Sequence, residues 1–461
     1  MAAERRWLLE SGGGRFALLA DNGIGWAVAD LALHFNGALS VPLPSYFTEA
    51  QRLHALDDAG VDCLLTDAPL DAQEWLEGWR VAGRSGRTGL TMFRRSLDPS
   101  TCAAAPAGTA KVTYTSGSTS APKGVCLSAT QLEAVAASLA AATASLPLSR
   151  HLCLLPLPTL LENVAGLYAP LLRGATCLLP GRDATGMSYA GPDPSRLLGC
   201  IGDSRPESLI LVPELLQLLV VAAERGWPVP PSLQFMAVGG AAVPPLLLER
   251  AAALGLPVFE GYGLSECASV VCLNTPEARR PGTVGRPLPH ARLRVAHDGE
   301  ILVSGTTLLG YLGDVARPAG GELATGDLGA MDQDGFVTIR GRRRNMFITS
   351  LGRNVTPEWV EQEIRQFAPI RHVMVSGESR PYPVALVSAA PELPAVDIGR
   401  AIQAANARLP DYAQVRRWWR TATPFSFDDG LLTANGRLRR EAIAARYGAQ
   451  LDALYQQEPA S

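Results

Sequence analysis

Short apolar runs alternate with alanine- and leucine-rich segments through the first three quarters of the chain. The runs have the length of buried strands, and the segments between them, such as QLEAVAASLAAATASL (131–146), have the composition of helices. Five of these runs are FALLA (16–20), CLLTD (63–67), HLCLLPL (151–157), SLILVP (208–213) and FMAVGG (235–240). Because parallel strands need long crossover connections, the alternation predicts an α/β fold with largely parallel sheets and helices outside them.

The pattern changes after residue 291. RLRVAHDGEILVSG (292–305) and DQDGFVTIRG (332–341) alternate like strands and are broken by Asp-Gly turns, which is typical of hairpins in a smaller β unit. A further short β/α segment follows from about residue 345. At 461 residues the chain exceeds one ordinary core, so we expect a large N-terminal domain and a small α+β domain.

Bulk properties exclude several classes of protein. The N-terminus is charged and then glycine-rich, and no stretch of about 18 residues is free of polar or breaking residues, so we expect a cytoplasmic protein without a membrane span. The net charge of −3 gives no general attraction to nucleic acid. Eight cysteines without a CxxC pair and six histidines without metal-ligand spacing are interpreted as packing or surface residues.

One loop suggests phosphate binding. Of the 41 basic residues only two are lysines, and one of them, Lys123, lies in TYTSGSTSAPKG (113–124); the other, Lys111, precedes it. Backbone N–H groups and hydroxyls cradle phosphate oxygens, and a cation neutralises them. The loop is not a Walker A motif, because Lys123 stands between Pro122 and Gly124. Taken alone, such a loop is more often a surface turn.

Three further motifs follow in order: GYGLSE (261–266), TGD (325–327) and GRRRNMFITSLGRNVTPEWVE (341–361). The flat ring of Tyr262 is suited to cover a purine, and the carboxylate of Glu266 is suited to a hard divalent cation. Asp327 is suited to accept both hydroxyls of a ribose. Each motif is weak alone, but the ordered set points to a nucleotide site.

With these motifs and VGGAAVPP (238–245), the sequence resembles the AMP-forming adenylating enzymes, which include acyl- and aryl-CoA synthetases, adenylation domains and luciferases. The resemblance runs from FALLADNGIGWAVADLAL (16–33) to TANGRLRREAI (433–443). It implies an N-terminal ATP- and acid-binding domain over 1–340, a hinge over 341–344 that contains Arg344, and a mobile C-terminal domain over 345–461.

The resemblance also implies the site residues. The ATP-binding residues would be Thr115, Ser116, Gly117, Ser118, Thr119, Lys123, Gly239, Gly240, Ala241, Gly261, Tyr262, Gly263, Ser265, Asp327 and Arg342. Lys123, Glu266 and Arg437 would be catalytic, with Glu266 holding Mg²⁺. Ser350, Gly352 and Arg353 would line a tunnel for the thiol.

The implied reaction converts ATP and a carboxylic acid into an acyl-AMP and pyrophosphate, and then into a thioester. The acceptor would be CoA or the phosphopantetheine of an acyl carrier protein. The sequence looks closest to the fatty acyl-CoA synthetase branch, so we expect a fatty or aromatic acid. An amino-acid-activating enzyme is an alternative, although we identify no aspartate suited to bind an α-amine.

Three positions depart from the family pattern. Ser120 replaces a usual glycine, Thr159 stands where many members have a histidine or aromatic residue, and Arg437 replaces the usual adenylating lysine. They support a second hypothesis, a nucleotide-binding pseudo-enzyme with a regulatory role.

Two other features allow two interpretations each. Glu162 either buttresses a helix or binds substrate. Arg416, Arg417 and Arg420 around Trp418 and Trp419 are either a solvated face with packed aromatics or a contact for CoA phosphate or an acidic carrier protein. From residue 341 onward 16 arginines stand against 12 acidic residues, a net of +4, which suits an anionic partner.

Overall fold

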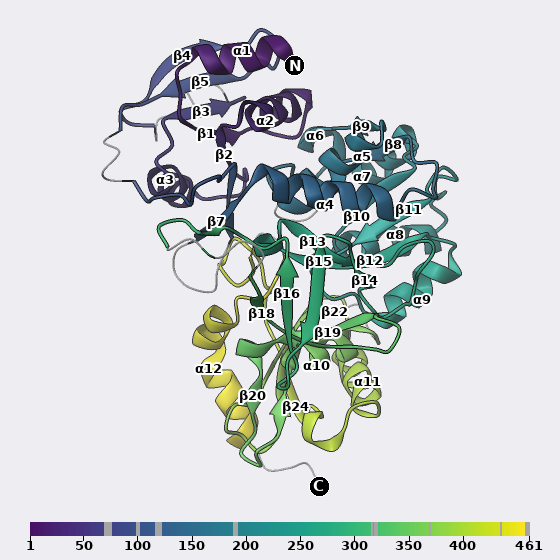
Figure 1. The fold of residues 1–461 in the computed structure, drawn as a ribbon. Coiled ribbons are helices and arrows are strands. Elements are labelled where there is room, and N and C mark those ends of the chain that lie inside the picture. Colours follow the sequence, from purple (N-terminus) through teal and green to yellow (C-terminus); the bar gives the residue numbers. More distant parts are fainter. Residues whose placement is uncertain are drawn as a thin grey trace.

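The computed structural model describes residues 1–68, 76–97, 102–115, 122–187, 192–314, 317, 321–367, 370–433 and 436–456. Figure 1 shows the N-terminus at one end of the molecule, the C-terminus at the other, and the strands β15 and β16 near the middle. The mixed α/β architecture with parallel sheets confirms the expected fold class.

The first sheet has eight strands in the order β17-β7-β6-β2-β1-β3-β5-β4. The strands β6, β2, β1 and β3 are parallel, and antiparallel strands flank them. Their bounds are β1 (Arg15–Leu19), β2 (Leu39–Pro42), β3 (Cys63–Thr66), β4 (Arg80–Arg84), β5 (Thr91–Arg94), β6 (Lys111–Thr115), β7 (Lys123–Leu127) and β17 (Gly310–Tyr311). The helices of this part are α1 (Ala2–Glu10), α2 (Ile24–Asn36), α3 (Glu49–Asp58) and α4 (Ala129–Ala142).

The second sheet has seven strands in the order β14-β13-β12-β11-β10-β8-β9, of which the last five are parallel. Their bounds are β8 (Arg150–Leu152), β9 (Thr176–Leu178), β10 (Ser208–Leu211), β11 (Phe235–Val238), β12 (Val258–Leu264), β13 (Ser269–Leu273) and β14 (Arg286–Pro287). The helical segments here are η3 (Leu161–Tyr168), α5 (Ala169–Leu172), α6 (Arg182–Thr185), α7 (Pro194–Ser204), α8 (Pro213–Glu224), α9 (Pro245–Ala253) and η4 (Ser265–Cys267). The segment η3 is a π-helix, a wide turn that is rare and often occurs at functional sites.

The hairpins expected from residue 292 form a four-stranded antiparallel sheet in the order β15-β16-β18-β19. The strands are β15 (Ala291–Val295), β16 (Glu300–Gly305), β18 (Leu323–Met331) and β19 (Val337–Arg342). The 3₁₀ turn η5 (Arg343–Asn345) follows β19 directly.

The C-terminal part carries a two-stranded and a three-stranded sheet. Its elements are β20 (Phe347–Ile348), β21 (Asn354–Val355), α10 (Pro357–Arg365), β22 (Ile370–Ser376), β23 (Val384–Ala389), α11 (Ala395–Asn406), η6 (Asp411–Ala413), β24 (Arg417–Arg420) and α12 (Arg440–Gln456). Residues of α10 and α11 share one core with β22 and β23, and α12 belongs to a second core that also includes β23. Within the described residues, no helix is both long and apolar enough to cross a bilayer.

Local sequence explains where several elements begin and bend. Ser128 caps α4 through a reciprocal capping box with Gln131. Gly263 lies at a β-bulge between β12 and β13, where a side-chain Cβ would stand 1.8 Å from the carbonyl oxygen of Ser269. Only glycine fits so close an approach of two backbones.

A buried ammonium group joins strand β6 of the first sheet to the helical segments α2 and η3. Lys111 on β6 is 2 % exposed, and its Nζ donates to Asp30 Oδ1 at 2.8 Å, Asn163 Oδ1 at 2.5 Å and the Tyr168 hydroxyl at 3.3 Å. Asn163 Nδ2 and the Tyr168 hydroxyl both donate to the other Asp30 oxygen. An ammonium has three donors, whereas a guanidinium has five, so this pocket with three acceptors explains a lysine in an arginine-rich chain.

We expect Lys111→Met to lower the free energy of unfolding by about 3–5 kcal/mol, because it leaves the Asp30 carboxylate buried without its counter-charge. Urea unfolding followed by fluorescence checks this, since Trp26 lies on the same helix as Asp30 and is buried. Lys123→Met is the matched control: its side chain is exposed, and we expect a change within about 0.5 kcal/mol. Equal unfolding midpoints for both variants would contradict the role of the buried network.

Candidate active site

The two glycine motifs meet at one edge of the second sheet. Strands β11 and β12 are neighbours and parallel, with Val238 opposite Glu260, so the residues after their carboxyl ends lie side by side. A Cβ added at Gly239 would stand 3.3 Å from the carbonyl oxygen of Gly261. In open α/β sheets the carboxyl ends of the strands are where ligands bind.

Tyr262, Asp327 and Arg342 form one hydrogen-bonded cluster beside this edge. The Tyr262 hydroxyl donates to Asp327 Oδ2 at 2.6 Å, and Arg342 Nε lies 2.7 Å from Asp327 Oδ1. Asp327 and Arg342 are register partners on β18 and β19, whereas Tyr262 comes from β12. The sequence named all three residues, and the structure places them in contact across two sheets.

The Asp327 carboxylate is nearly inaccessible, with the residue 4 % exposed. Burial raises the pKa of this carboxyl, and the charge of Arg342 and the hydrogen bond from Tyr262 oppose that rise. Asp327 is therefore a preorganised acceptor whose two oxygens already face two donors.

Glu266 is linked to Lys123 through a residue that the sequence interpretation missed. The Tyr311 hydroxyl donates to Glu266 Oε1 at 3.0 Å, and Lys123 Nζ lies 5.6 Å from the centre of the Tyr311 ring. Glu266 comes from η4, Lys123 from β7 and Tyr311 from the paired strand β17. The one available signal was an aromatic residue next to a glycine in GYLGD (310–314), the same pattern as in GYG.

The phosphate loop itself is only partly described. Thr115 ends β6 and pairs with Lys123 at the start of β7, so the predicted loop begins and ends at one hairpin. Ser116, Gly117, Ser118, Thr119 and Ser120 lie outside the described residues. Ser265 opens η4 beside Glu266.

Arg437 reaches the same sheet edge from the C-terminal part. Its guanidinium Nη2 donates to the carbonyl oxygen of Gly240. The charges that act on it include those of Asp327, Arg342 and Glu214. A second contact between the two parts is the donation from Gln362 Nε2 on α10 to the carbonyl oxygen of Val243 at 2.7 Å.

The segment 341–344, predicted as a hinge, carries a separate ion-pair group. Arg343 Nη1 lies 2.5 Å from Glu300 Oε2, and Arg343 Nη2 lies 3.0 Å from Asp298 Oδ2. A hollow of about 600 Å³ lies beside it and is lined partly by Arg342 and Arg344.

The predicted tunnel residues lie elsewhere. Arg353 lines a hollow of about 550 Å³ on the C-terminal part together with Thr349, Leu351, Tyr382, Tyr412 and Arg416. Ser350 and Gly352 belong to the same turn between β20 and β21. Among the described residues, no hydrogen bond or ion pair joins Ser350, Gly352 or Arg353 to the Tyr262–Asp327 cluster.

The Arg-Trp segment on β24 contacts mainly the cores and the backbone of the C-terminal part. Trp418 and Trp419 are partly buried, and they pack against the two different cores of the C-terminal part. Arg417 donates to the carbonyl oxygen of Leu454, and Arg420 donates to those of Leu393 and Ala390. These contacts favour the interpretation as packed aromatics flanked by arginines.

Glu162 and Thr159 have internal partners. Glu162 is fully buried, and its Oε2 accepts from the backbone N–H of Leu155 at 3.3 Å. Burial raises the pKa of this carboxyl. The Thr159 hydroxyl donates to the carbonyl oxygen of Pro156 at 2.7 Å. Of the two interpretations of Glu162, the buttress of a helix agrees with these contacts.

Comparison with known families agrees with this geometry. The sequence profile described as AMP-binding enzyme matches residues 6–312, and that described as AMP-binding enzyme C-terminal domain matches residues 345–459. The chain belongs to the AMP-binding enzyme family.

Individual relatives are named as CoA ligases. The long-chain-fatty-acid–CoA ligase FadD15 of Mycobacterium bovis is 31 % identical over 44 % of this chain and 39 % of its own length. A 3-[(3aS,4S,7aS)-7a-methyl-1,5-dioxo-octahydro-1H-inden-4-yl]propanoyl:CoA ligase of Mycobacterium tuberculosis is 31 % identical over 79 % of this chain and 76 % of its own length. The match thus spans well under half of FadD15 and about three quarters of the second relative.

A solved structure shares the fold. The anthranilate CoA ligase AuaEII, in complex with anthranoyl-AMP, aligns with a TM-score of 0.78 over 98 % of this chain and 90 % of its own. Its sequence identity is 20 %, so this likeness establishes the fold alone.

Glu260, directly before the GYGLSE motif, gives a prediction about pH. It is 7 % exposed, its Oε2 accepts from the backbone N–H of Gly282 at 3.0 Å, and burial raises its pKa to about 7. A carboxyl with a raised pKa in the folded state stabilises the fold below its unfolded pKa, and this contribution is lost as pH rises through 7. We expect wild type to lose about 2–3 kcal/mol relative to Glu260→Gln between pH 5 and pH 8.

Urea unfolding of both proteins at several pH values measures this difference. Glu249→Gln, which replaces an exposed carboxyl on α9, is measured beside it as a control. A pH-independent difference for Glu260→Gln would show that Glu260 is ionised throughout.

Proposed function

We propose that this chain is an AMP-forming acid–thiol ligase. It activates a carboxylic acid with ATP, releases pyrophosphate, and transfers the acyl group from acyl-AMP to a thiol. The observation that carries the proposal is the convergence of Tyr262, Asp327, Arg342 and Arg437 at one sheet edge of an AMP-binding family chain.

The nucleotide site follows from this cluster. The segments Gly239–Ala241 and Gly261–Tyr262 together frame the adenine, because their glycines allow backbone and base to approach closely. Asp327 accepts from both ribose hydroxyls, which replace the Tyr262 hydroxyl, while Arg342 keeps its ion pair with Oδ1 and holds the carboxylate in position. Thr115, Gly263 and Ser265 border the same site.

The phosphates extend toward Lys123, which neutralises the β- and γ-phosphates together with the loop of residues 116–119. Glu266 fits Mg²⁺, because a carboxylate oxygen is a hard ligand and Mg²⁺ is usually held by one or two carboxylates plus substrate phosphates. When bound, Mg²⁺ neutralises the charge of the pyrophosphate that leaves. Tyr311 orients the Glu266 carboxylate through its hydroxyl.

Arg437 stabilises charge during adenylation. The attack of a carboxylate on the α-phosphorus concentrates negative charge there, and a planar guanidinium binds carboxylate and phosphate oxygens together. Its present contact with the Gly240 carbonyl places it next to the proposed adenine segment. The hinge over 341–344 then rotates the C-terminal domain, so that the turn with Ser350, Gly352 and Arg353 serves the thiol step.

The acid is proposed to be fatty or aromatic. FadD15 is named for a long-chain fatty acid, whereas the second relative is named for a propanoate on a saturated bicyclic ring. The acceptor is proposed to be CoA or the phosphopantetheine of an acidic carrier protein. The exposed Arg353 in its hollow and the +4 charge beyond residue 340 support an anionic acceptor, whereas Arg416 in the same hollow is ion-paired with Asp411. A regulatory pseudo-enzyme is the second candidate, supported by Ser120, Thr159 and Arg437.

Asp327→Ala should weaken ATP binding by about 1.5–3 kcal/mol, because two ribose hydroxyls lose a charged acceptor. Isothermal titration with ATP measures the affinity. Asp332→Ala is the matched control: it removes an exposed carboxylate from the β18–β19 turn, and we expect unchanged affinity. An unchanged affinity for Asp327→Ala, in folded protein, would remove Asp327 from the ATP site.

Arg437→Ala should slow acyl-AMP formation by about 10²–10³-fold, the usual effect of losing one preorganised transition-state donor. Thioester formation from supplied acyl-AMP should stay nearly intact, and Arg437→Lys should retain substantial activity. Acid-dependent exchange of pyrophosphate into ATP measures the first step, and thioester yield with CoA or a carrier protein measures the second. Wild-type protein that binds ATP but shows no exchange across fatty and aryl acids would favour the pseudo-enzyme.

A further inference from the structure

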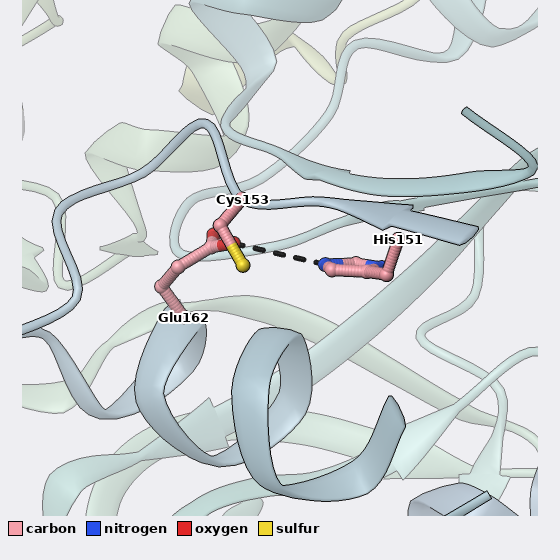
Figure 2. Close-up of side chains that lie close together, drawn as sticks. All are labelled: His151, Cys153 and Glu162. Carbon is pink, nitrogen blue, oxygen red and sulfur yellow. Dashed lines mark ion pairs between the residues drawn. The ribbon is translucent and has the colours of Figure 1, made fainter. Parts of the chain in front are cut away.

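A second group of reactive side chains lies beneath the π-helix η3, apart from the proposed ATP site. His151 lies on β8, Cys153 follows the end of that strand, and Glu162 projects from η3 toward them, as Figure 2 shows. Residues two apart on a strand face the same side, so His151 and Cys153 both meet the helix. Their side-chain donor atoms and a Glu162 oxygen all lie within 4.8 Å of one another.

Two polar atoms in this cluster have no hydrogen-bond partner among the described residues. They are His151 Nε2 and Glu162 Oε1, which lie 3.7 Å apart, too far for a hydrogen bond but within ion-pair distance if the imidazole is protonated (Figure 2). His151 is 4 % exposed and Glu162 is 0 % exposed. Buried polar atoms are almost always paired, and one further group placed between these two would satisfy both.

The rest of each side chain is anchored so that these atoms stay directed inward. His151 Nδ1 is 2.9 Å from the hydroxyl of Ser208 on the neighbouring strand β10, and Glu162 Oε2 accepts from the Leu155 N–H. When Nδ1 carries the ring proton and donates to Ser208, Nε2 presents a lone pair to the cluster. This second hydrogen bond is the usual way a protein orients a metal-binding histidine.

The π-helix also leaves the space open. A Cβ at Gly166 would stand 2.4 Å from Glu162 Oε1 and 3.1 Å from His151 Nε2. The carbonyl oxygen of the same Gly166 accepts from Cys153 Sγ at 3.2 Å and is 3.7 Å from the sulfur of Cys177, the register partner of His151 on β9. A second thiol therefore borders the cluster.

We propose that His151 Nε2, Cys153 Sγ and Glu162 Oε1 form a buried binding site for one divalent metal ion of the zinc class. Nitrogen, sulfur and carboxylate oxygen are the donors that Zn²⁺ takes, and a thiolate selects it over Mg²⁺ or Ca²⁺. The separation of 3.7 Å between the nitrogen and the oxygen suits two ligands of a tetrahedral ion.

Charge balance favours a divalent ion in this buried position. On binding, the S–H bond of Cys153 breaks, its proton leaves to solvent, and the sulfur forms the bond to the metal. Glu162 binds as the carboxylate and His151 as the neutral imidazole. The two negative ligands cancel the charge of the ion, and no oxidant or reductant is needed. The ion would fasten η3 to the edge of the second sheet, independently of the proposed ligase activity.

The metal content of the purified full-length protein tests the site. We expect about one zinc per chain by mass spectrometry of the metal, either as isolated or after refolding with one equivalent of Zn²⁺. Refolding with Co²⁺ should give the near-ultraviolet absorption of a cobalt–thiolate bond. Because this absorption band is measured on the wild-type protein, it tests the sulfur ligand even if a substitution unfolds the chain.

Matched variants locate the ion. Cys153→Ala should abolish the cobalt–thiolate band and the bound zinc, whereas Cys63→Ala, which removes an equally inaccessible thiol from β3, should keep both. Glu162→Gln keeps the shape but removes the charge and should lower zinc affinity at least tenfold.

Zinc below about one tenth of an equivalent, both as isolated and after refolding, would overturn the proposal and leave a buried acid–imidazole pair. Undiminished zinc in Cys153→Ala and Glu162→Gln, or cobalt bound without the thiolate band, would overturn it as well.

Discussion

The buried ammonium of Lys111 is the interaction on which the arrangement of the large sheets depends. It joins β6 to α2 and η3 through Asp30, Asn163 and Tyr168, and each of its three donors has an acceptor. The surrounding core contains residues of β1 and β3 from the first sheet and of β13 from the second. A buried charge is stable only when all its hydrogen-bonding groups are paired. The pairing of Lys111 therefore fixes how β6, α2 and η3 pack together and restricts movement of η3.

From that arrangement follows a site assembled from parts distant in the chain. The second sheet supplies the glycine-rich edge and Tyr262, the four-stranded sheet supplies Asp327 and Arg342, and the C-terminal part supplies Arg437. The first sheet adds Lys123 and Tyr311 from paired strands. No one of these units holds the cluster alone, so its geometry depends on packing between them.

Much of this was predictable from the sequence. The apolar runs indicated the parallel strands, and GYGLSE with TGD named Tyr262 and Asp327 before their contact was known. The residues that the sequence did not predict have a physical reason. Tyr311 comes close to Lys123 only because its strand β17 pairs with β7, although the two residues are about 190 positions apart. No local sequence pattern indicates such a long-range strand pairing. The wide turn of η3 likewise has no local signature, so neither the buttress by Glu162 nor its approach to His151 followed from spacing.

The scarcity of lysine has a chemical consequence for a chain proposed to make a mixed anhydride. Primary amines are the side chains that such an intermediate acylates most readily, whereas a guanidinium stays protonated and is a poor nucleophile. Lys111 is enclosed in the core, and the position nearest the reacting phosphate in the proposed mechanism is Arg437. Apart from Lys123, the chain has no exposed ε-amine that the proposed acyl-AMP could acylate. This scarcity would protect the enzyme from acylating and inactivating itself during turnover.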